Sequence, residues 1–326
     1  MNISVKYRLA AGSRDQGFTL VELMIAMVLG VVLIGGVISV LLANKQSAKT
    51  NSALSQLQDN SRTAFEMMAR DIRQAGSTPC GNTAVTNNLN SLNGANTDWY
   101  LWGNSIQGAD NATTASPALP GAIAQSGIAT HGEGPVSTSL ITAGAACANG
   151  APLATAPAGI NAGDLVMACD TNQAYIFQTA AFAGGILPVA AIGAGGAPGN
   201  AAATLGCGSF AQSAYVAPYE ADYWYVRAAG TGAPANTLSL YRARYSAGVL
   251  QSNEIIRGVR ELLITYHTTG ATGFVSATAV GAAWSAVDAV RVTLTLQSLD
   301  ARSGVGTNVA QPTSLMRTFT TTIGIR

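Results

Sequence analysis

The clearest pattern in the sequence is a long apolar run near its start, over residues 18–43. Leu, Ile, Val and Met dominate the run, and no charged side chain occurs between Leu23 and Asn44. About 20 apolar residues in a helix are enough to cross the ~30 Å hydrocarbon core of a bilayer. The run is apolar all round rather than along one stripe, which is typical of a membrane span. We therefore predict a transmembrane helix over residues 18–43.

The helical pattern continues beyond this span. No proline occurs between residues 18 and 79, and apolar or small side chains recur at steps of three and four. They are Leu54, Leu57, Ser61, Phe65, Met68 and Ile72. This spacing puts them on one helix face and predicts packing of that face on a folded domain. Gly76 supplies a C-terminal cap and Pro79 a stop, so the predicted helix covers residues 18–76.

The remainder of the chain divides into two regions of different pattern. Residues 77–215 are rich in Ala, Gly, Thr, Asn and Pro, which predicts long surface loops rather than a second compact domain. Within them, residues 165–169 and 174–179 flank a four-residue turn and predict a hairpin.

Residues 216–326 predict an antiparallel sheet. In residues 289–298 apolar and polar side chains alternate, as in a strand with one buried and one wet face. Four further strand-like segments are residues 221–228, 237–246, 254–267 and 315–325. A long helix followed by an antiparallel sheet predicts an α+β fold.

Charge is scarce and unevenly distributed. Charged residues make up 10% of the chain and the net charge is +1. Residues 1–73 carry a net charge of +3, residues 74–226 a net charge of −7, and residues 227–326 a net charge of +5. This partition argues against a protein that coats nucleic acid.

The one acid inside the apolar run is Glu22. A carboxylate in a membrane segment costs a few kcal/mol unless it has a partner, so Glu22 predicts a functional role. The basic leader that precedes the run is expected to stay in the cytoplasm. A cut between Gly17 and Phe18 would create an amine one helical turn from Glu22, within reach of its carboxylate in the same chain or a neighbouring one.

The segment Gly17-Phe18-Thr19-Leu20-Val21-Glu22 resembles the cleavage and methylation motif of type IV prepilins and type II secretion pseudopilins. The resemblance implies a pilin fold, with residues 1–17 as a cleaved cytoplasmic leader. A prepilin peptidase would cut after Gly17 and methylate the amine of Phe18, and Glu22 would neutralise the amine of an adjacent subunit. The apolar half lacks the helix-breaking proline of many major pilins. The alternative is a plain signal anchor in which Glu22 is incidental.

The same resemblance implies partners and location. The partners would be the prepilin peptidase, other minor and major pilins, and the inner-membrane pilus assembly platform. The protein would sit in the bacterial inner membrane as a single-pass protein with its head in the periplasm, and at the pilus or cell surface after assembly.

The stem ending in MARDIRQAG and the tail VDAVRVTLTLQS…RTFTTTIGIR resemble the PilW group of minor pilins. That resemblance implies a priming or tip subunit that serves twitching motility or adhesion. A minor pseudopilin of type II secretion and a DNA-binding or adhesive tip pilin are the alternatives.

The cysteines predict disulfides rather than a metal site. There are four, Cys80, Cys147, Cys169 and Cys207, with no CxxC pair and only two histidines, His131 and His267. The predicted span delivers them to an oxidising compartment, so we expect two intramolecular bridges. Four cysteines allow three connectivities, and the sequence does not choose between them. We expect no metal and no cofactor.

No constellation of residues predicts an enzyme, because neither histidine has a nucleophile or carboxylate at a meaningful spacing. The alternative with the most specific residues is a DNA-binding face on the C-terminal sheet. It would consist of Arg242, Arg244, Arg257 and Arg260 with Tyr241, Tyr245 and Tyr266. Solvent-facing strand positions often carry arginine, however, so we do not expect nucleic acid to be a partner.

Overall fold

The computed structural model describes residues 17, 19–81, 84–92, 98–134, 139–192, 197–300 and 314–325. Phe18 and residues 1–16 lie outside this range, and so do the predicted leader cleavage and methylation at that end of the chain. The chain divides into two units, Met1–Asn51 and Ser52–Arg326, with the boundary inside the long helix.

The predicted long helix is confirmed as α1, Leu20–Gln74. Its buried side chains all lie in the second half, where they follow the predicted stripe and add small neighbours. The buried positions are Ala53, Leu57, Ser61, Ala64, Met68, Ala69, Asp71 and Ile72. The helix stops where Gly76 takes a φ of +84°, a conformation that glycine adopts without steric cost. The face departs from the predicted pattern in that Leu54 and Phe65 are only partly buried, and in that an aspartate is buried on it.

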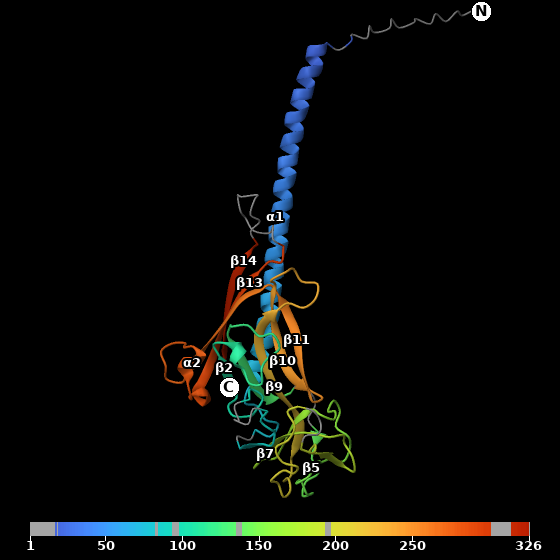
Figure 1. The fold of residues 1–326 in the computed structure, drawn as a ribbon, viewed down its shortest axis with the longest axis vertical. Coiled ribbons are helices and arrows are strands. Elements are labelled where there is room, and N and C mark those ends of the chain that lie inside the picture. Colours follow the sequence, from blue (N-terminus) through green and yellow to red (C-terminus); the bar gives the residue numbers. More distant parts are fainter. Residues whose placement is uncertain are drawn as a thin grey trace, which may run out of the picture. The chain divides into compact units, whose positions relative to one another are not determined.

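The second unit is built mainly from antiparallel strands, which confirms the α+β fold (Figure 1). The larger sheet has nine strands in the described residues. Six of them follow the order β1-β7-β6-β9-β10-β11; in addition, β3 and β4 each pair with β9, and β2 pairs with β3. Its strands are β1 (Val85–Asn87), β2 (Ile106–Ala109), β3 (Gly127–Glu133), β4 (Ser139–Leu140), β6 (Leu165–Cys169), β7 (Ala174–Gln178), β9 (Tyr215–Ala228), β10 (Leu238–Ser246) and β11 (Val249–Arg257). Only β1 and β7 pair in parallel among them.

A second sheet of three strands has the order β12-β13-β14. These strands are β12 (Val259–Thr268), β13 (Val287–Gln297) and β14 (Met316–Gly324), and β5 (Gly150–Pro152) with β8 (Ile186–Pro188) forms a separate two-stranded ribbon. The short helical turns are η1 (Ala112–Thr114), α2 (Ala277–Val280) and η2 (Trp284–Ala286). The prediction of a single C-terminal sheet is therefore wrong, because residues 216–326 contribute to two.

The cause is a glycine in the predicted strand 254–267. Gly258 has a φ of +82°, and a Cβ at that position would lie 2.4 Å from the carbonyl oxygen of Gln297. Only glycine permits this conformation together with this close approach. The chain therefore ends β11 at Arg257, turns, and starts β12 at Val259 in the other sheet.

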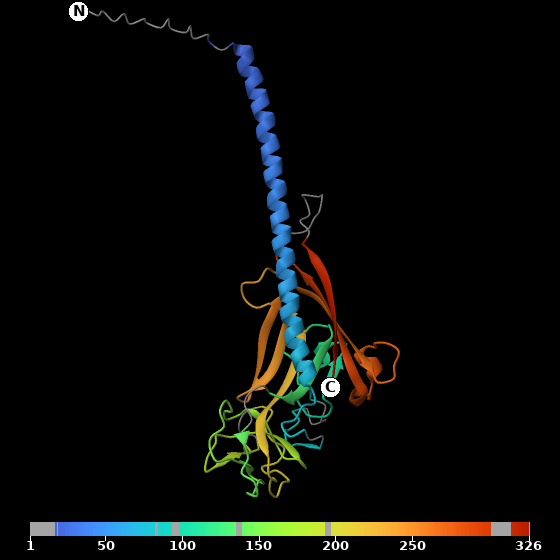
Figure 2. The same cartoon turned by 180° about the vertical axis from the view of Figure 1, so that it is seen from behind.

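The second half of α1 packs over both sheets. Its buried side chains share one apolar cluster with Trp224 and Leu240 of the larger sheet and with Ile264 and Val292 of the smaller one. Figure 2 shows this part of α1 lying across the two sheets. The helix thus joins the sheets through a common core.

Residues 77–215 contain more regular structure than their composition predicts. The 165–169/174–179 hairpin is confirmed as the antiparallel pair β6–β7. Both strands of this hairpin contribute to a separate apolar cluster, with Phe177, Leu187, Phe210 and Val216 among its buried members. This core was not predicted from the sequence, because the region is rich in Ala and Gly, which pack closely but contribute little to a hydrophobic pattern.

Two disulfides pin this region. Cys80 is bonded to Cys169 and Cys147 to Cys207, with Cα–Cα distances of 5.9 and 5.6 Å. The first joins the segment after α1 to the end of β6, and the second joins two loops of the apolar cluster.

Reduction of these bonds should lower stability. The bonded residues are 89 and 60 positions apart, and loops of that length remove roughly 4 kcal/mol each of unfolded-state entropy in the chain-entropy model. We expect a double Cys80→Ala/Cys169→Ala variant to lose about 2–4 kcal/mol in denaturant unfolding of the full chain. Thiol counting on the denatured, unreduced wild type is expected to find no free cysteine, and four free thiols would contradict the pairing.

Candidate functional site

The first candidate is the start of α1. Thr19 precedes the helix, and its Oγ1 accepts a hydrogen bond from the backbone N–H of Glu22 at 3.3 Å. Thr19-x-x-Glu22 is the sequence pattern of a capping box, which satisfies orphan N–H groups at a helix start. The hydrogen bond present is the one that the Thr19 side chain accepts, a helix cap that was not predicted from the sequence. Its carboxylate is exposed and makes no ion pair with any residue that the structure describes.

The helix that follows is apolar on every side. Each large hydrophobic side chain from Leu20 to Leu42 is at least half exposed. Among the described residues, α1 is the one helix long and apolar enough to cross a membrane. Its most apolar 18-residue stretch has a mean hydropathy of 2.9, and none of that stretch is buried. Exposed apolar surface of this extent is unfavourable in water, so lipid or other apolar helices must cover it. Gly17 is described and exposed just before this helix.

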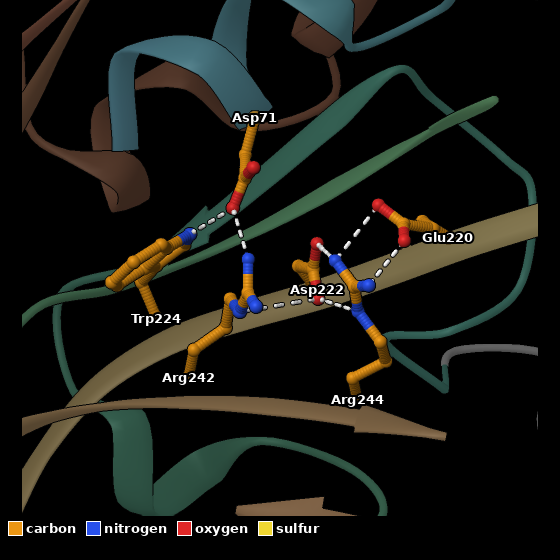
Figure 3. A network of polar contacts seen from close by, with 6 residues as sticks. All are labelled: Asp71, Glu220, Asp222, Trp224, Arg242 and Arg244. Carbon is orange, nitrogen blue, oxygen red and sulfur yellow. Dashed lines mark hydrogen bonds and ion pairs between the residues drawn. The ribbon is translucent and has the colours of Figure 1, made fainter. Parts of the chain in front are cut away.

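The second candidate is a buried ionic network at the other end of α1 (Figure 3). Asp71, in the last turn of α1, accepts a hydrogen bond at 3.0 Å from the indole Nε1 of Trp224 on β9. The same oxygen, Oδ2, lies 3.5 Å from Nη1 of Arg242 on β10. The network therefore ties the helix to two strands of the larger sheet.

Arg244 binds two further carboxylates. Its Nε and Nη2 donate to the two oxygens of Asp222 at 2.6 and 2.5 Å. Its Nη2 also donates to Glu220 Oε2 at 2.8 Å, and its Nη1 donates to the other oxygen of Glu220. Strand register explains the arrangement, since Arg242 lies opposite Trp224 and Arg244 opposite Asp222. Alternate residues of a strand share a face, so all five side chains point toward α1.

The network holds one more acid than base. Three carboxylates face two guanidinium groups, and the Asp71 and Asp222 side chains are only 3% exposed. Burial, with Asp222 nearby, raises the pKa of Asp71 to about 6. Burial also raises the pKa of Glu220 to about 7, against the opposing effect of Arg244. Because these groups interact closely, the network titrates as a unit that keeps a proton well above the normal range of a carboxyl group.

This titration predicts a pH-dependent stability. A carboxyl group whose pKa is raised by folding binds more protons in the folded state, so its contribution to stability falls as pH rises from about 4 to about 7. We expect Asp71→Asn to gain roughly 2–3 kcal/mol relative to wild type over that range, since one pKa unit is worth ~1.4 kcal/mol. The exposed Asp59 on the same helix is the matched control. Denaturant unfolding at the two pH values measures the effect, and equal behaviour of Asp71→Asn and Asp59→Asn would contradict it.

The arginines proposed for DNA are mostly engaged elsewhere. Arg242 and Arg244 belong to the buried network, and Arg257 forms a 3.0 Å ion pair with Glu254. Arg260 is exposed and has no ion pair among the described residues. The three tyrosines meant to stack on bases, Tyr241, Tyr245 and Tyr266, are buried. The structure therefore does not bring these residues together on an open basic and aromatic face.

Both histidines are held by hydrogen bonds within the folded domain. His131 is buried, and its ring nitrogens lie 2.7 Å from the carbonyl oxygen of Asn104 and 2.6 Å from that of Trp99. Burial lowers the pKa of His131, although two carbonyl partners favour its charged form. His267 pairs with Asp288 at 2.6 Å, which raises the pKa of the histidine. Within the described ranges, no group of three or more His, Cys, Asp or Glu side chains is arranged to hold a metal ion.

Residues 12–38 match the family described as the prokaryotic N-terminal methylation motif. The match contains Gly17, Phe18 and Glu22 and ends inside the apolar half of α1. No curated protein and no solved structure shows significant similarity to the chain. Together with the exposed apolar helix, the match supports a type IV pilin or pseudopilin-type protein that is anchored in a membrane. A motif of this kind implies processing by a prepilin peptidase and interaction with other pilins, and its family is structural rather than enzymatic.

Proposed function

We propose that the protein is a minor pilin of the PilW group that takes part in type IV pilus assembly as a priming or tip subunit. The observation that carries the proposal is a methylation motif followed directly by a helix that is apolar on every side. The α+β domain behind the helix supports the same class. The length of the chain, the stem that ends at Gly76 and the pattern of the last strands favour the PilW group within that class.

The proposed mechanism begins with cleavage. A prepilin peptidase cuts after Gly17 and methylates the new amine of Phe18. The apolar helix then holds the subunit in the inner membrane, with the C-terminal domain in the periplasm. During assembly the helix leaves the lipid and packs against other apolar helices, so its exposed side chains stay covered throughout. Glu22 pairs with the Phe18 amine of a neighbouring subunit and sets the stagger between helices.

Mass spectrometry of the mature protein tests the first step. We expect a mature chain that begins at methylated Phe18, because the junction Gly17-Phe18 lies inside the matched motif. A mature protein that begins at Met1, or at any residue beyond Ala43, would contradict the proposal. A Gly17→Glu variant is expected to keep its leader, since the peptidase would no longer accept the residue before the cut. Its mass would then exceed that of the mature wild type by the mass of residues 1–17.

The main alternative is a minor pseudopilin of type II secretion, which shares the N-terminal motif. Deletion of the gene distinguishes the two, because loss of surface pili and twitching motility favours the pilus and loss of exoprotein release favours secretion. A DNA-binding tip pilin is the second alternative. Filter binding of DNA to the full-length protein in detergent tests it, with an affinity that falls steeply with salt as the supporting result.

A further inference from the structure

We propose that a small uncharged pocket beside β2, β3 and β9 binds one neutral sugar residue of a glycan. The pocket has a volume of about 260 Å³, and none of its lining side chains is charged. Gln107 of β2, Thr114 of η1, Tyr223 of β9, and Trp99 and Ser116 of the adjoining loops supply its polar groups. The inference is independent of pilus assembly, because it concerns only the folded C-terminal domain.

Strand register explains why a cavity exists at this place. Gln107 lies opposite Ala129 on β3, and Ala129 lies opposite Tyr223 on β9. Directly opposed residues of neighbouring strands point to the same face of a sheet, so these three form one row. The methyl group of Ala129 is much smaller than its two neighbours. A space therefore remains between the Gln107 and Tyr223 side chains.

The aromatic lining is held in place. The rings of Trp99 and Tyr223 meet edge to face with centroids 5.7 Å apart, and Trp99 stacks on Tyr245 at 5.7 Å. The backbone N–H of Trp99 donates to the carbonyl oxygen of Ser116 at 2.7 Å, and its own carbonyl oxygen contacts His131. Both aromatic residues are 3% exposed. A site built from fixed side chains loses little conformational entropy when a ligand binds.

Three polar groups of the lining residues have unused hydrogen-bonding capacity. The indole Nε1–H of Trp99 is buried and has no hydrogen-bond partner among the residues that the structure describes. Among the described residues, neither the Tyr223 hydroxyl nor the Gln107 side-chain amide has a partner in the structure. Buried unpaired donors are rare in native proteins, and each one raises the question of what satisfies it. Burial raises the pKa of Tyr223, which keeps its hydroxyl neutral and able to donate.

These features favour a hydroxylated neutral ligand. The lining residues provide no cation for a phosphate or carboxylate and no anion for an amine. A sugar hydroxyl both donates and accepts, which matches the amide of Gln107 and the hydroxyl of Tyr223, and the C–H groups of the sugar can pack on aromatic carbon. The volume is below the ~300–1,000 Å³ of pockets for drug-sized ligands, so it holds a single ring rather than an extended chain.

Saturation-transfer difference NMR on the full-length protein in detergent tests the proposal. The probes are the methyl glycosides of glucose, galactose, mannose and N-acetylglucosamine, with glucuronate and glucosamine as charged counterparts. We expect saturable binding of at least one neutral glycoside in the millimolar range, and weaker binding of its charged counterpart because the pocket offers no counter-charge. Absence of saturable binding by all four neutral probes, or binding of the charged ones alone, would overturn the proposal.

Substitutions locate the binding to this pocket. Gln107→Ala and Tyr223→Phe each remove one hydrogen-bonding group and are expected to raise the Kd roughly fivefold, the equivalent of one net hydrogen bond of ~1 kcal/mol. Gln251→Ala on β11 and Tyr245→Phe in the same aromatic cluster are matched controls outside the lining. Because Gln107 is exposed, its variant is expected to fold normally. Equal effects of the pocket variants and the controls would show that the sugar binds elsewhere.

Discussion

Replacement of Glu22 by alanine is expected to leave the protein in the membrane fraction and to remove it from assembled filaments. Membrane insertion should persist because loss of a carboxylate from an apolar segment lowers the cost of insertion, by at most the ~2.5–3.5 kcal/mol that translocon scales give for an acid at the centre of a span. Assembly should fail because the proposed partner of the neighbouring Phe18 amine is gone. Fractionation followed by immunodetection in sheared pili measures both. Recovery of the variant in filaments at the wild-type level would contradict the proposed pairing.

The alanine variant alone does not separate charge from helix capping. Thr19 Oγ1 accepts a hydrogen bond from the Glu22 backbone N–H. Glu22 also stands at the position from which a capping-box carboxylate reaches back to the cap residue, and a helix cap is worth about 1 kcal/mol. Glu22→Gln separates the two, since glutamine also serves in capping boxes but carries no charge. If charge pairing drives assembly, Glu22→Gln fails as Glu22→Ala does. If capping is all that Glu22 contributes, Glu22→Gln assembles normally and Thr19→Val fails.

A matched control for both variants is Glu66→Gln. Glu66 lies on the same helix, its side chain is 65% exposed, and among the described residues it forms an ion pair with Arg62, four residues before it. An exposed pair of this kind is worth a few tenths of a kcal/mol at most. Glu66→Gln is therefore expected to insert and assemble like the wild type. Failure of this control would indicate that any loss of negative charge on α1 disturbs assembly. That result would contradict a specific role of Glu22.

The elements that were predictable are those whose signal is local. The apolar run and the stripe from Leu54 to Ile72 fix a helix because each residue needs only its neighbours at three and four positions to define a face. The strand at 287–297 was recognisable for the same reason, since its side chains alternate. Gly258 shows the limit of local reasoning. A glycine inside a strand-like pattern indicated nothing definite until the neighbouring Gln297 carbonyl oxygen was known.

The ionic network could not be predicted because its members are distant in sequence. Trp224 and Asp71 are 153 residues apart, and strand register alone brings Asp222 and Glu220 to Arg244. One signal was available. Asp71 follows Ala64 and Met68 at positions i+7 and i+3, so it falls on the buried face of the helix. An acid at such a position requires a partner, but the sequence does not identify that partner.

Replacement of Arg244 by methionine is expected to destabilise the folded domain by about 3–5 kcal/mol near neutral pH. Asp222, whose side chain is 3% exposed, and the largely buried Glu220 would then lack their main cationic partner. The cost of leaving such charges unpaired exceeds the value of the pair itself. Denaturant unfolding of the full chain measures the change. Arg257→Met is the matched control, because Arg257 pairs with Glu254 at a more exposed site, where the two side chains are 36% and 21% exposed and the cost should stay near ~1 kcal/mol.

Two further measurements separate buried charge from lost packing. If unpaired carboxylates cause the loss in Arg244→Met, acidification to about pH 5 should reduce it, because protonation removes the charges that need a partner. A double variant, Glu220→Gln/Arg244→Met, should likewise recover part of the stability at neutral pH, because it leaves one buried charge fewer. Packing alone predicts neither effect, since the arginine stem is missing in both variants and at every pH. A loss that is independent of pH and undiminished in the double variant would therefore show that Arg244 acts through its volume rather than its charge.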